Sequence, residues 1–114
     1  MKRCQFEEVI KKALLELPEE IIGRLENIEI TVEDSPKTSS KKSLLLGLYH
    51  GVPLEKRGSF YGGVLPDKIT LYQKNIEAIS KNEAEMVEQI KRTLLHEIGH
   101  YFGISERKLR SLGY

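Results

Sequence analysis

Apolar residues recur at helical spacing near the N-terminus of the chain. The pattern i, i+3, i+4, i+7, i+8, i+11 predicts an amphipathic helix over residues 6–17. Its members are Phe6, Val9, Ile10, Ala13, Leu14 and Leu17. Pro18 ends this helix and starts a second short one, because proline is disfavoured inside a helix but accepted in its first turn. Both helices are interpreted as structural.

Three later stretches are predicted to form β-strands. Residues 28–33 alternate apolar and polar side chains, which is typical of a strand with one buried face. Residues 44–49 form a nearly continuous apolar run, which predicts a strand buried on both faces. Residues 69–72 alternate again and predict a third strand. Residues 34–42 have the composition of an exposed loop, and the glycine-rich residues 54–67 either border a cleft or simply cross the surface.

A longer helix is predicted from about residue 81 to residue 102. Residues 80–83 have the spacing of a capping box. An apolar stripe at helical spacing follows, formed by Val87, Ile90, Leu94, Ile98 and Tyr101. Residues 73–79 are interpreted as a connection, and Ser105 as the N-cap of a last short helix that ends at Leu112.

This order of elements predicts an α+β fold, in which a small mixed or antiparallel sheet packs against helices. The length of 114 residues fits a single domain over residues 1–114. The net charge of +1 gives no reason to expect a nucleic acid or an anionic membrane as a partner. The chain has no apolar run long enough for a membrane span and no apolar core of a signal peptide. Cys4 is the only cysteine, so no internal disulfide is possible and a cytoplasmic location is expected.

The stretch that carries the chemistry is residues 96–106, His-Glu-Ile-Gly-His-Tyr-Phe-Gly-Ile-Ser-Glu. His96 and His100 are four residues apart, so on a helix they lie one turn apart on the same face. Two imidazoles in that arrangement can bind one zinc ion at about 2.0–2.1 Å each. Glu97 lies beside the first histidine, where its carboxylate can accept a proton from a metal-activated water. The spacing therefore predicts the metal site of a hydrolase.

The third metal ligand is inferred by elimination. A catalytic zinc site normally has three protein ligands and one water. After His100 the chain contains no His, Cys or Asp, and its only acid is Glu106. Gly103 is placed to end the helix in a left-handed conformation, so that the chain can turn back. Glu106 is therefore predicted as the third ligand, although an acid in the first turn of a helix also stabilises the helix itself. His50 and Cys4 have no fixed spacing to the motif and are not expected to bind the metal.

The H-E-x-x-H-x-x-G-x-x-E segment resembles the metzincin arrangement of the zincin metallopeptidases, and the whole chain resembles the short bacterial zincin-like metallopeptidases, a minimal version of that fold. Further matching segments are residues 27–34, 47–53, 65–71 and 112–114. The resemblance implies an extended substrate that pairs with a strand lining the cleft, and strands near residues 47–50 and 68–72 both qualify. Two features depart from the metzincin pattern. The third ligand is Glu rather than His, and no Met follows the motif, so the metzincin Met-turn is missing.

The preferred hypothesis is a zinc-dependent peptidase acting on a peptide or protein substrate. His96, His100 and Glu106 hold the ion, and Glu97 acts as general base and then as general acid. A further donor should stabilise the oxyanion. The tyrosines available for that role are Tyr49, Tyr61, Tyr72, Tyr101 and Tyr114.

Two other hypotheses stay open. The first is a non-hydrolytic zinc-binding module for peptide recognition or regulation, which the small size and the missing Met-turn favour and the retained Glu97 disfavours. The second is another hydrolase, such as an amidase or a nuclease, although the near-neutral charge disfavours a nuclease. Iron, cobalt and manganese also suit a site of two histidines and one carboxylate, and the oligomeric state is open.

Overall fold

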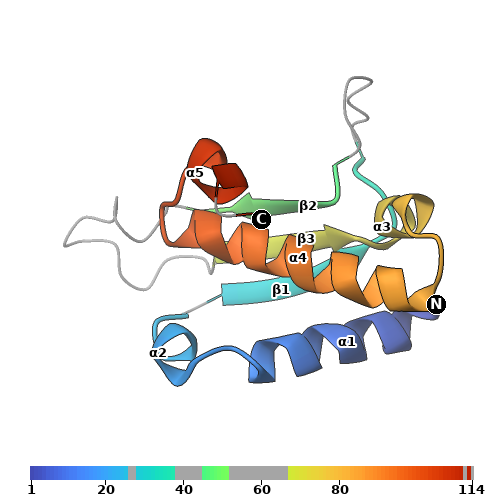
Figure 1. Cartoon of the computed structure of the whole chain (residues 1–114), viewed down its shortest axis with the longest axis horizontal. Helices are drawn as coiled ribbons and strands as arrows, with labels where there is room; N and C mark the ends of the chain where they lie inside the picture. Colours follow the sequence, from blue (N-terminus) through green and yellow to red (C-terminus); the bar gives the residue numbers. More distant parts are fainter. Residues whose placement is uncertain (26–27, 38–44, 52–66, 112, 114) are drawn as a thin grey trace.

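A three-stranded mixed sheet forms the centre of the fold. The computed structural model describes residues 1–25, 28–37, 45–51, 67–111 and 113. The strands lie in the order β1-β3-β2, with bounds Ile28–Glu33 for β1, Gly47–His50 for β2 and Asp67–Tyr72 for β3. β1 and β3 are parallel, and β2 is antiparallel to β3 (Figure 1). The predicted α+β fold is confirmed, and the sheet is the mixed one of the two predicted arrangements.

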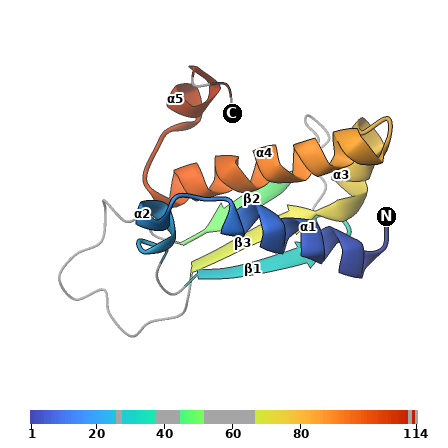
Figure 2. The same cartoon turned by 60° about the horizontal axis from the view of Figure 1, so that its bottom comes forward.

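The described part of the chain also contains helices. They are α1 (Arg3–Leu15), α2 (Glu19–Ile22), α3 (Gln73–Ile79), α4 (Glu83–Tyr101) and α5 (Glu106–Ser111). Figure 2 shows α1 and α4 side by side across one face of the sheet, with α5 separated from α1 by α4. The site described below lies on this outer side of α4.

The hydrophobic core lies between α1, α4 and β3. Its buried side chains are Phe6, Ile10, Ala13, Ile69, Leu71, Ile76, Met86, Ile90, Leu94 and Ile98. The predicted stripe of α4 is confirmed from Ile90 to Tyr101, and Met86 rather than Val87 is its first buried residue. Because one face of α4 is fixed in the core, the opposite face is held in a constant position for functional side chains.

A strand buried on both faces was predicted over residues 44–49, but in the structure the strand with this burial is β3. β3 is the central strand, and all of its residues except Lys68 are buried. The run predicted over 44–49 is instead the edge strand β2, in which Leu48 and Tyr49 are half-buried and His50 is exposed. The prediction was wrong because a run of apolar residues does not distinguish an interior strand from an edge strand beside a groove.

The connection predicted over residues 73–79 is the helix α3. Gln73 and Ile76 are its only buried residues, and the side chain of its N-cap Tyr72 makes no capping hydrogen bond. Such a short element has too few apolar positions to display a helical period. The helix therefore depends on its packing against the core rather than on a signal in its own sequence.

The start of α4 differs from the predicted capping box by two residues. Asn82 is the N-cap, and its Oδ1 accepts a hydrogen bond from the backbone N–H of Glu85 at 2.8 Å. Ser80 instead donates its hydroxyl to the carbonyl of Ile76 at the end of α3, at 2.7 Å. Asn and Ser are about equally good N-caps, so the sequence offered two competing starts.

Two predicted loops fall mainly outside the described residues, namely most of 34–42 and nearly all of 54–67. The described part of the first includes Asp34, whose carboxylate forms an ion pair with Arg3 of α1. In the part of the chain that the structure describes, no helix combines the length and the apolar character needed to cross a membrane.

Candidate metal centre

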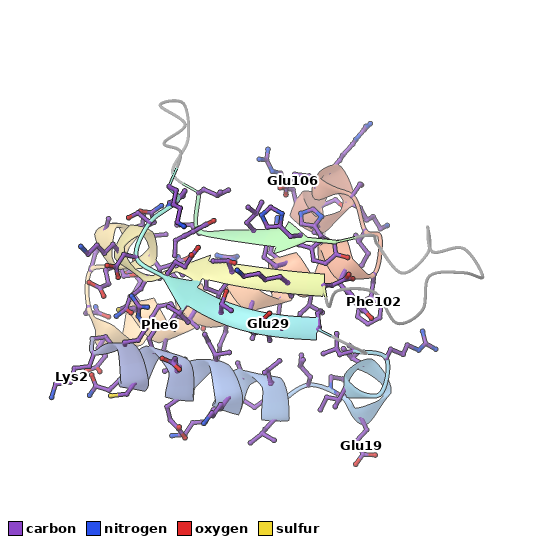
Figure 3. The ribbon with its side chains drawn as sticks, turned by 180° about the vertical axis from the view of Figure 1, so that it is seen from behind. Lys2, Phe6, Glu19, Glu29, Phe102 and Glu106 are labelled. Carbon is purple, nitrogen blue, oxygen red and sulfur yellow. The ribbon has the colours of Figure 1, made fainter. Side chains whose placement is uncertain are left out.

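The three predicted metal ligands lie together on the outer side of α4. Nε2 of His96 is 2.8 Å from Oε2 of Glu106, and Nε2 of His100 is 3.7 Å from Oε1 of Glu106. One potential ligand atom from each residue lies within 4.8 Å of the other two. Figure 3 shows Glu106 on α5, beyond the β2 edge of the sheet and on the opposite side of the molecule from Glu19. The fold thus brings the three residues together, and their role as ligands stays a prediction.

The turn after α4 orients one of the histidines. Nδ1 of His100 is 3.0 Å from the carbonyl oxygen of Ile104. Because a carbonyl can only accept, Nδ1 is the donor in this contact, and Nε2 lies on the side of Glu106. Gly103 makes this turn possible with a φ of 83°, a left-handed conformation that glycine adopts without strain. The predicted helix end at Gly103 is confirmed, and the same turn fixes the tautomer of His100.

Helix α5 is held against α4 by one close contact. Leu109 is 2% exposed, and a Cβ atom added at Gly99 would lie 2.5 Å from its Cδ2. Only glycine allows α5 to approach α4 this closely. Ser105 caps α5, since its Oγ accepts a hydrogen bond from the N–H of Lys108 at 3.2 Å, as the sequence predicted. Together these contacts place Glu106 opposite the histidines, although its side chain is 51% exposed.

Glu97 is buried beside this group. It is 7% exposed and lies between α4 and β2, where a Cβ added at Gly47 would be 3.2 Å from its Cγ. Burial raises the pKa of Glu97 above its ordinary value, and the nearby Glu106 adds to the increase. The two histidines and the backbone N–H of Tyr49 favour the carboxylate and act in the opposite direction on this pKa. A carboxyl group with a raised pKa suits a residue that must gain and lose a proton near neutral pH.

The residues present fit a zinc ion. Tetrahedral coordination with bonds of about 2.0–2.1 Å separates two ligand atoms by about 3.3 Å. The separations of 2.8 Å and 3.7 Å lie on either side of that value. Two imidazole nitrogens and one carboxylate oxygen form a three-ligand set of the catalytic kind, whereas structural zinc sites usually have four protein ligands.

Comparison with known proteins agrees with this geometry. A family model described as zincin-like metallopeptidase matches residues 25–114. The chain belongs to the zincin-like metallopeptidase family. No curated protein matches it. Among solved structures it is similar to a conserved hypothetical protein from Thermus thermophilus, with a TM-score of 0.63 and 24% sequence identity. The match covers 90% of this chain and 94% of that one, and it shows a shared fold.

Two hollows open onto the predicted metal site of this zincin-like protein. The first lies on the His100 side and has a volume of about 570 Å³; the second lies on the His96 side and has a volume of about 370 Å³. Glu97, Glu106 and Gly47 line both hollows. The two are therefore parts of one groove that follows β2 and passes the predicted ligands.

The hydroxyl groups of two candidate tyrosines are already bonded to protein groups. Tyr49 donates to Oδ2 of Asp67 at 2.8 Å. Tyr101 is fully buried, as predicted, and donates to the backbone carbonyl of Arg24 at 3.2 Å. Neither hydroxyl is therefore directed at the ligand group in this arrangement.

The remaining sequence candidates lie elsewhere. Tyr72 ends β3, and burial raises its pKa. Tyr61 and Tyr114 lie outside the described residues. His50 at the end of β2 and the exposed Cys4 of α1 are not in the ligand group, within the residues that the structure describes.

Sequence reasoning missed the contacts between elements that position the site. Gly99 and Leu109 set the distance between α4 and α5, and Gly47 lets β2 approach Glu97. One signal was available, because a glycine inside a helix costs about 1 kcal/mol relative to alanine and often marks a close approach. Nothing in the sequence indicated that Leu109 is the side chain that Gly99 accommodates.

Proposed function

We propose that this protein is a zinc-dependent peptidase that hydrolyses peptide bonds in peptide or protein substrates. The observation that carries the proposal is the grouping of His96, His100 and Glu106 at a groove whose wall also holds the buried Glu97. Membership of the zincin-like metallopeptidase family supports the same class of activity.

The first part of the proposed mechanism concerns the three predicted ligands and the carbonyl group that orients one of them. His96, His100 and Glu106 would hold the ion, with the Ile104 carbonyl keeping Nε2 of His100 available. Zinc in such a site supplies a Lewis acid that polarises the scissile carbonyl and acidifies a water molecule.

Glu97 moves the proton. Its carboxylate accepts a proton from the attacking water and delivers it to the nitrogen of the leaving amine. Burial, which raises the pKa of Glu97, helps the side chain hold the proton between these two steps. The N–H of Tyr49 favours the carboxylate, which is the form required at the start of the reaction.

The position of β2 as an edge strand among the described strands supports a way to hold the substrate. The N–H of Tyr72 donates to the carbonyl of Leu46 at 2.9 Å, so Leu46 belongs to a hydrogen-bonded pair of the antiparallel ladder. Since such pairs alternate, the backbone groups of Gly47 and Tyr49 are directed away from β3, where the N–H of Tyr49 meets the Glu97 carboxylate. β3 is the central strand and β2 lines the groove, which favours β2 over β3 as the strand that pairs with an extended peptide.

A non-hydrolytic zinc-binding module for peptide recognition or regulation is the second candidate. The bonded hydroxyls of Tyr49 and Tyr101 favour it, because they leave the oxyanion without a tyrosine donor from these two residues. The retained Glu97 favours hydrolysis, because a site that only binds has no use for a base beside its ligands.

The location and the partners are part of the same proposal. The exposed free thiol of Cys4 suits the reducing cytoplasm. The net charge of +1 supports a peptide or protein substrate rather than a nucleic acid or an anionic membrane.

The test compares zinc-loaded wild-type protein with zinc-loaded Glu97→Gln on a peptide library read by mass spectrometry. We expect equal zinc content and a cleavage rate at least about 100-fold lower in the variant. Equal cleavage rates would remove Glu97 from the mechanism and with it the proposed peptidase. Wild-type protein that binds peptides but cleaves none would support the non-hydrolytic module.

A further inference from the structure

We propose that the His96 end of the groove binds a carboxylate carried by the substrate on the C-terminal side of the scissile bond, with Arg92 and Arg110 as its partners. The inference rests on the proposed function in that the substrate is a peptide lying along β2. An acidic side chain and the free C-terminus of a short peptide offer this same carboxylate.

Among the described residues that line the groove, the arginines lie at one end of it. Arg92 and Arg110 line the second hollow, together with the amide of Gln89. Among the described residues that line the first hollow there is no Lys or Arg. Since a groove that is positive at only one end favours one placement of an anionic ligand, this asymmetry points to a carboxylate at the His96 end.

Both guanidinium groups keep hydrogen-bond donors for a ligand. Nη2 of Arg92 donates to the carbonyl oxygen of Gly113 at 3.0 Å, which is a neutral partner. Nε of Arg110 forms a long, exposed ion pair with Oε2 of Glu106 at 3.9 Å, beyond hydrogen-bond distance, and the same oxygen is 2.8 Å from Nε2 of His96. Each guanidinium therefore keeps donors for a carboxylate, whose two oxygens match the planar fork of arginine.

The spacing along both helices sets the distance between the two arginines and the scissile bond. Arg92 precedes His96 by one turn of α4, and Arg110 follows Glu106 by one turn of α5. Four residues of helix correspond to about 6 Å. An extended peptide advances about 3.4 Å per residue, so the carboxylate belongs to the first or second residue from the scissile bond.

The direction of β2 decides on which side of the bond this residue lies. A Cβ added at Gly47, where β2 begins, would lie 2.8 Å from Cγ2 of Thr93. Farther along β2, the ring of Tyr49 contacts that of Tyr101 edge-on, at 6.1 Å between ring centres. β2 and α4 therefore run in the same direction. A peptide antiparallel to β2, the more stable pairing, directs its C-terminal half towards Thr93 and into the second hollow.

Binding by zinc-loaded Glu97→Gln protein tests the inference without requiring cleavage. The probes are short fluorescent peptides in which one residue, Glu or Gln, is moved through each position, with the C-terminus either free or amidated. We expect Glu to bind about 10-fold more tightly than Gln at one or two adjacent positions, or the free C-terminus to bind about 10-fold more tightly than the amide. The first result identifies an acidic side chain as the ligand, and the second identifies a terminal carboxylate.

Substitution of each arginine tests whether it causes the preference for a carboxylate. Arg92→Gln and Arg110→Gln, each introduced into the Glu97→Gln protein, should reduce the preference several-fold at equal zinc content. Arg107→Gln is the matched control, because Arg107 is an exposed arginine of α5 that lines neither hollow, and it should keep the preference.

Three outcomes would overturn the inference. They are equal affinity for all the peptides, a preference that survives both arginine substitutions, and failure of every peptide to bind. Failure of the wild-type protein to cleave peptides that it binds would overturn the peptidase proposal alone and leave the carboxylate preference measurable.

Discussion

The two sides of the predicted metal site are built differently. His96 and His100 lie on α4, a helix of 19 residues whose opposite face is buried in the core. Their separation is set by the backbone of that one helix. Glu106 lies on α5, a helix of 6 residues that follows a turn and is held by Leu109 against Gly99. The histidine pair is thus as stable as the core, whereas the position of Glu106 depends on a small tertiary contact.

The predicted ligands on α4 and the one on α5 also differ in how exposed their side chains are. The side chains of His96 and His100 are 19% and 26% exposed, and that of Glu106 is 51% exposed. A helix of the length of α5 is not stable by itself, so its docking against α4 has to order Glu106, the predicted third ligand. We infer that changes in α5 tune metal affinity, while changes to the α4 histidines remove it.

Substitution of a predicted ligand on each side gives the largest expected effect. His96→Ala should abolish zinc binding at micromolar concentrations, and Glu106→Ala should weaken it by at least about 100-fold while leaving the histidine pair. Competition with a chromophoric chelator measures both affinities. His50→Ala is the control, since this exposed histidine lies outside the ligand group and should bind as wild type. Full affinity in Glu106→Ala would mean that the α5 side supplies no ligand.

The contact between the helices should matter without any change to a ligand. A methyl group at Gly99 would lie 2.5 Å from Cδ2 and 3.2 Å from Cδ1 of Leu109, so this buried leucine would have to shift. Gly99→Ala should therefore displace α5 and weaken zinc binding by about 10-fold, an effect of the size seen for groups that support metal ligands.

A double variant separates this effect from a general loss of structure. Leu109→Ala removes the atoms that clash, so Gly99→Ala/Leu109→Ala should bind zinc more tightly than Gly99→Ala alone. Far-ultraviolet circular dichroism checks that each variant keeps its helices. Additive losses in the double variant would show that the two residues do not act through their mutual contact.

The same division explains what the sequence predicted. Most features that depend on spacing within α4 could be derived, including the buried stripe from Ile90 to Tyr101 and the common face of His96 and His100. These features follow from the period of a single element, which the chain displays directly. Glu106 was reached by elimination of other residue types, and its distance from the histidines came only with the structure.

Features that depend on contacts between elements were not predicted. The strand β2 was placed in the interior because its apolar run carries no information about its neighbours. The helix α3 was missed because Ile76 is its only buried apolar residue. The placement of Arg92 and Arg110 at one hollow joins helices that are separate in the sequence, so no local pattern could reveal it.

Burial of the Glu97 carboxylate, on α4, should lower the stability of the folded protein at neutral pH. Burial raises the pKa of Glu97 in the folded protein, so the folded chain binds the proton more tightly than the unfolded chain. Stability of metal-free protein should then fall as the pH rises above the unfolded value of 4.5, until Glu97 is fully ionised. Glu97→Gln lacks this charge and should melt a few degrees higher than wild type at neutral pH, with a smaller difference at acidic pH.

Thermal melting in the presence of a chelator measures this difference. Glu88→Gln removes an exposed acid from the same helix and controls for the change in the charge of α4. A difference between Glu97→Gln and wild type that stays constant from pH 4 to pH 8 would contradict the role assigned to burial.

The smallest expected effect is at the cap of α5. Ser105→Ala removes the acceptor for the N–H of Lys108, and loss of an N-cap costs about 1 kcal/mol. If that cost falls entirely on the placement of Glu106, zinc binding weakens by about fivefold, less than in Gly99→Ala. Ser105→Asn keeps a capping oxygen and should restore most of the affinity. A loss in Ser105→Ala that equals or exceeds the loss in Gly99→Ala would mean that the cap, rather than the contact of Leu109 with Gly99, holds the third ligand in place.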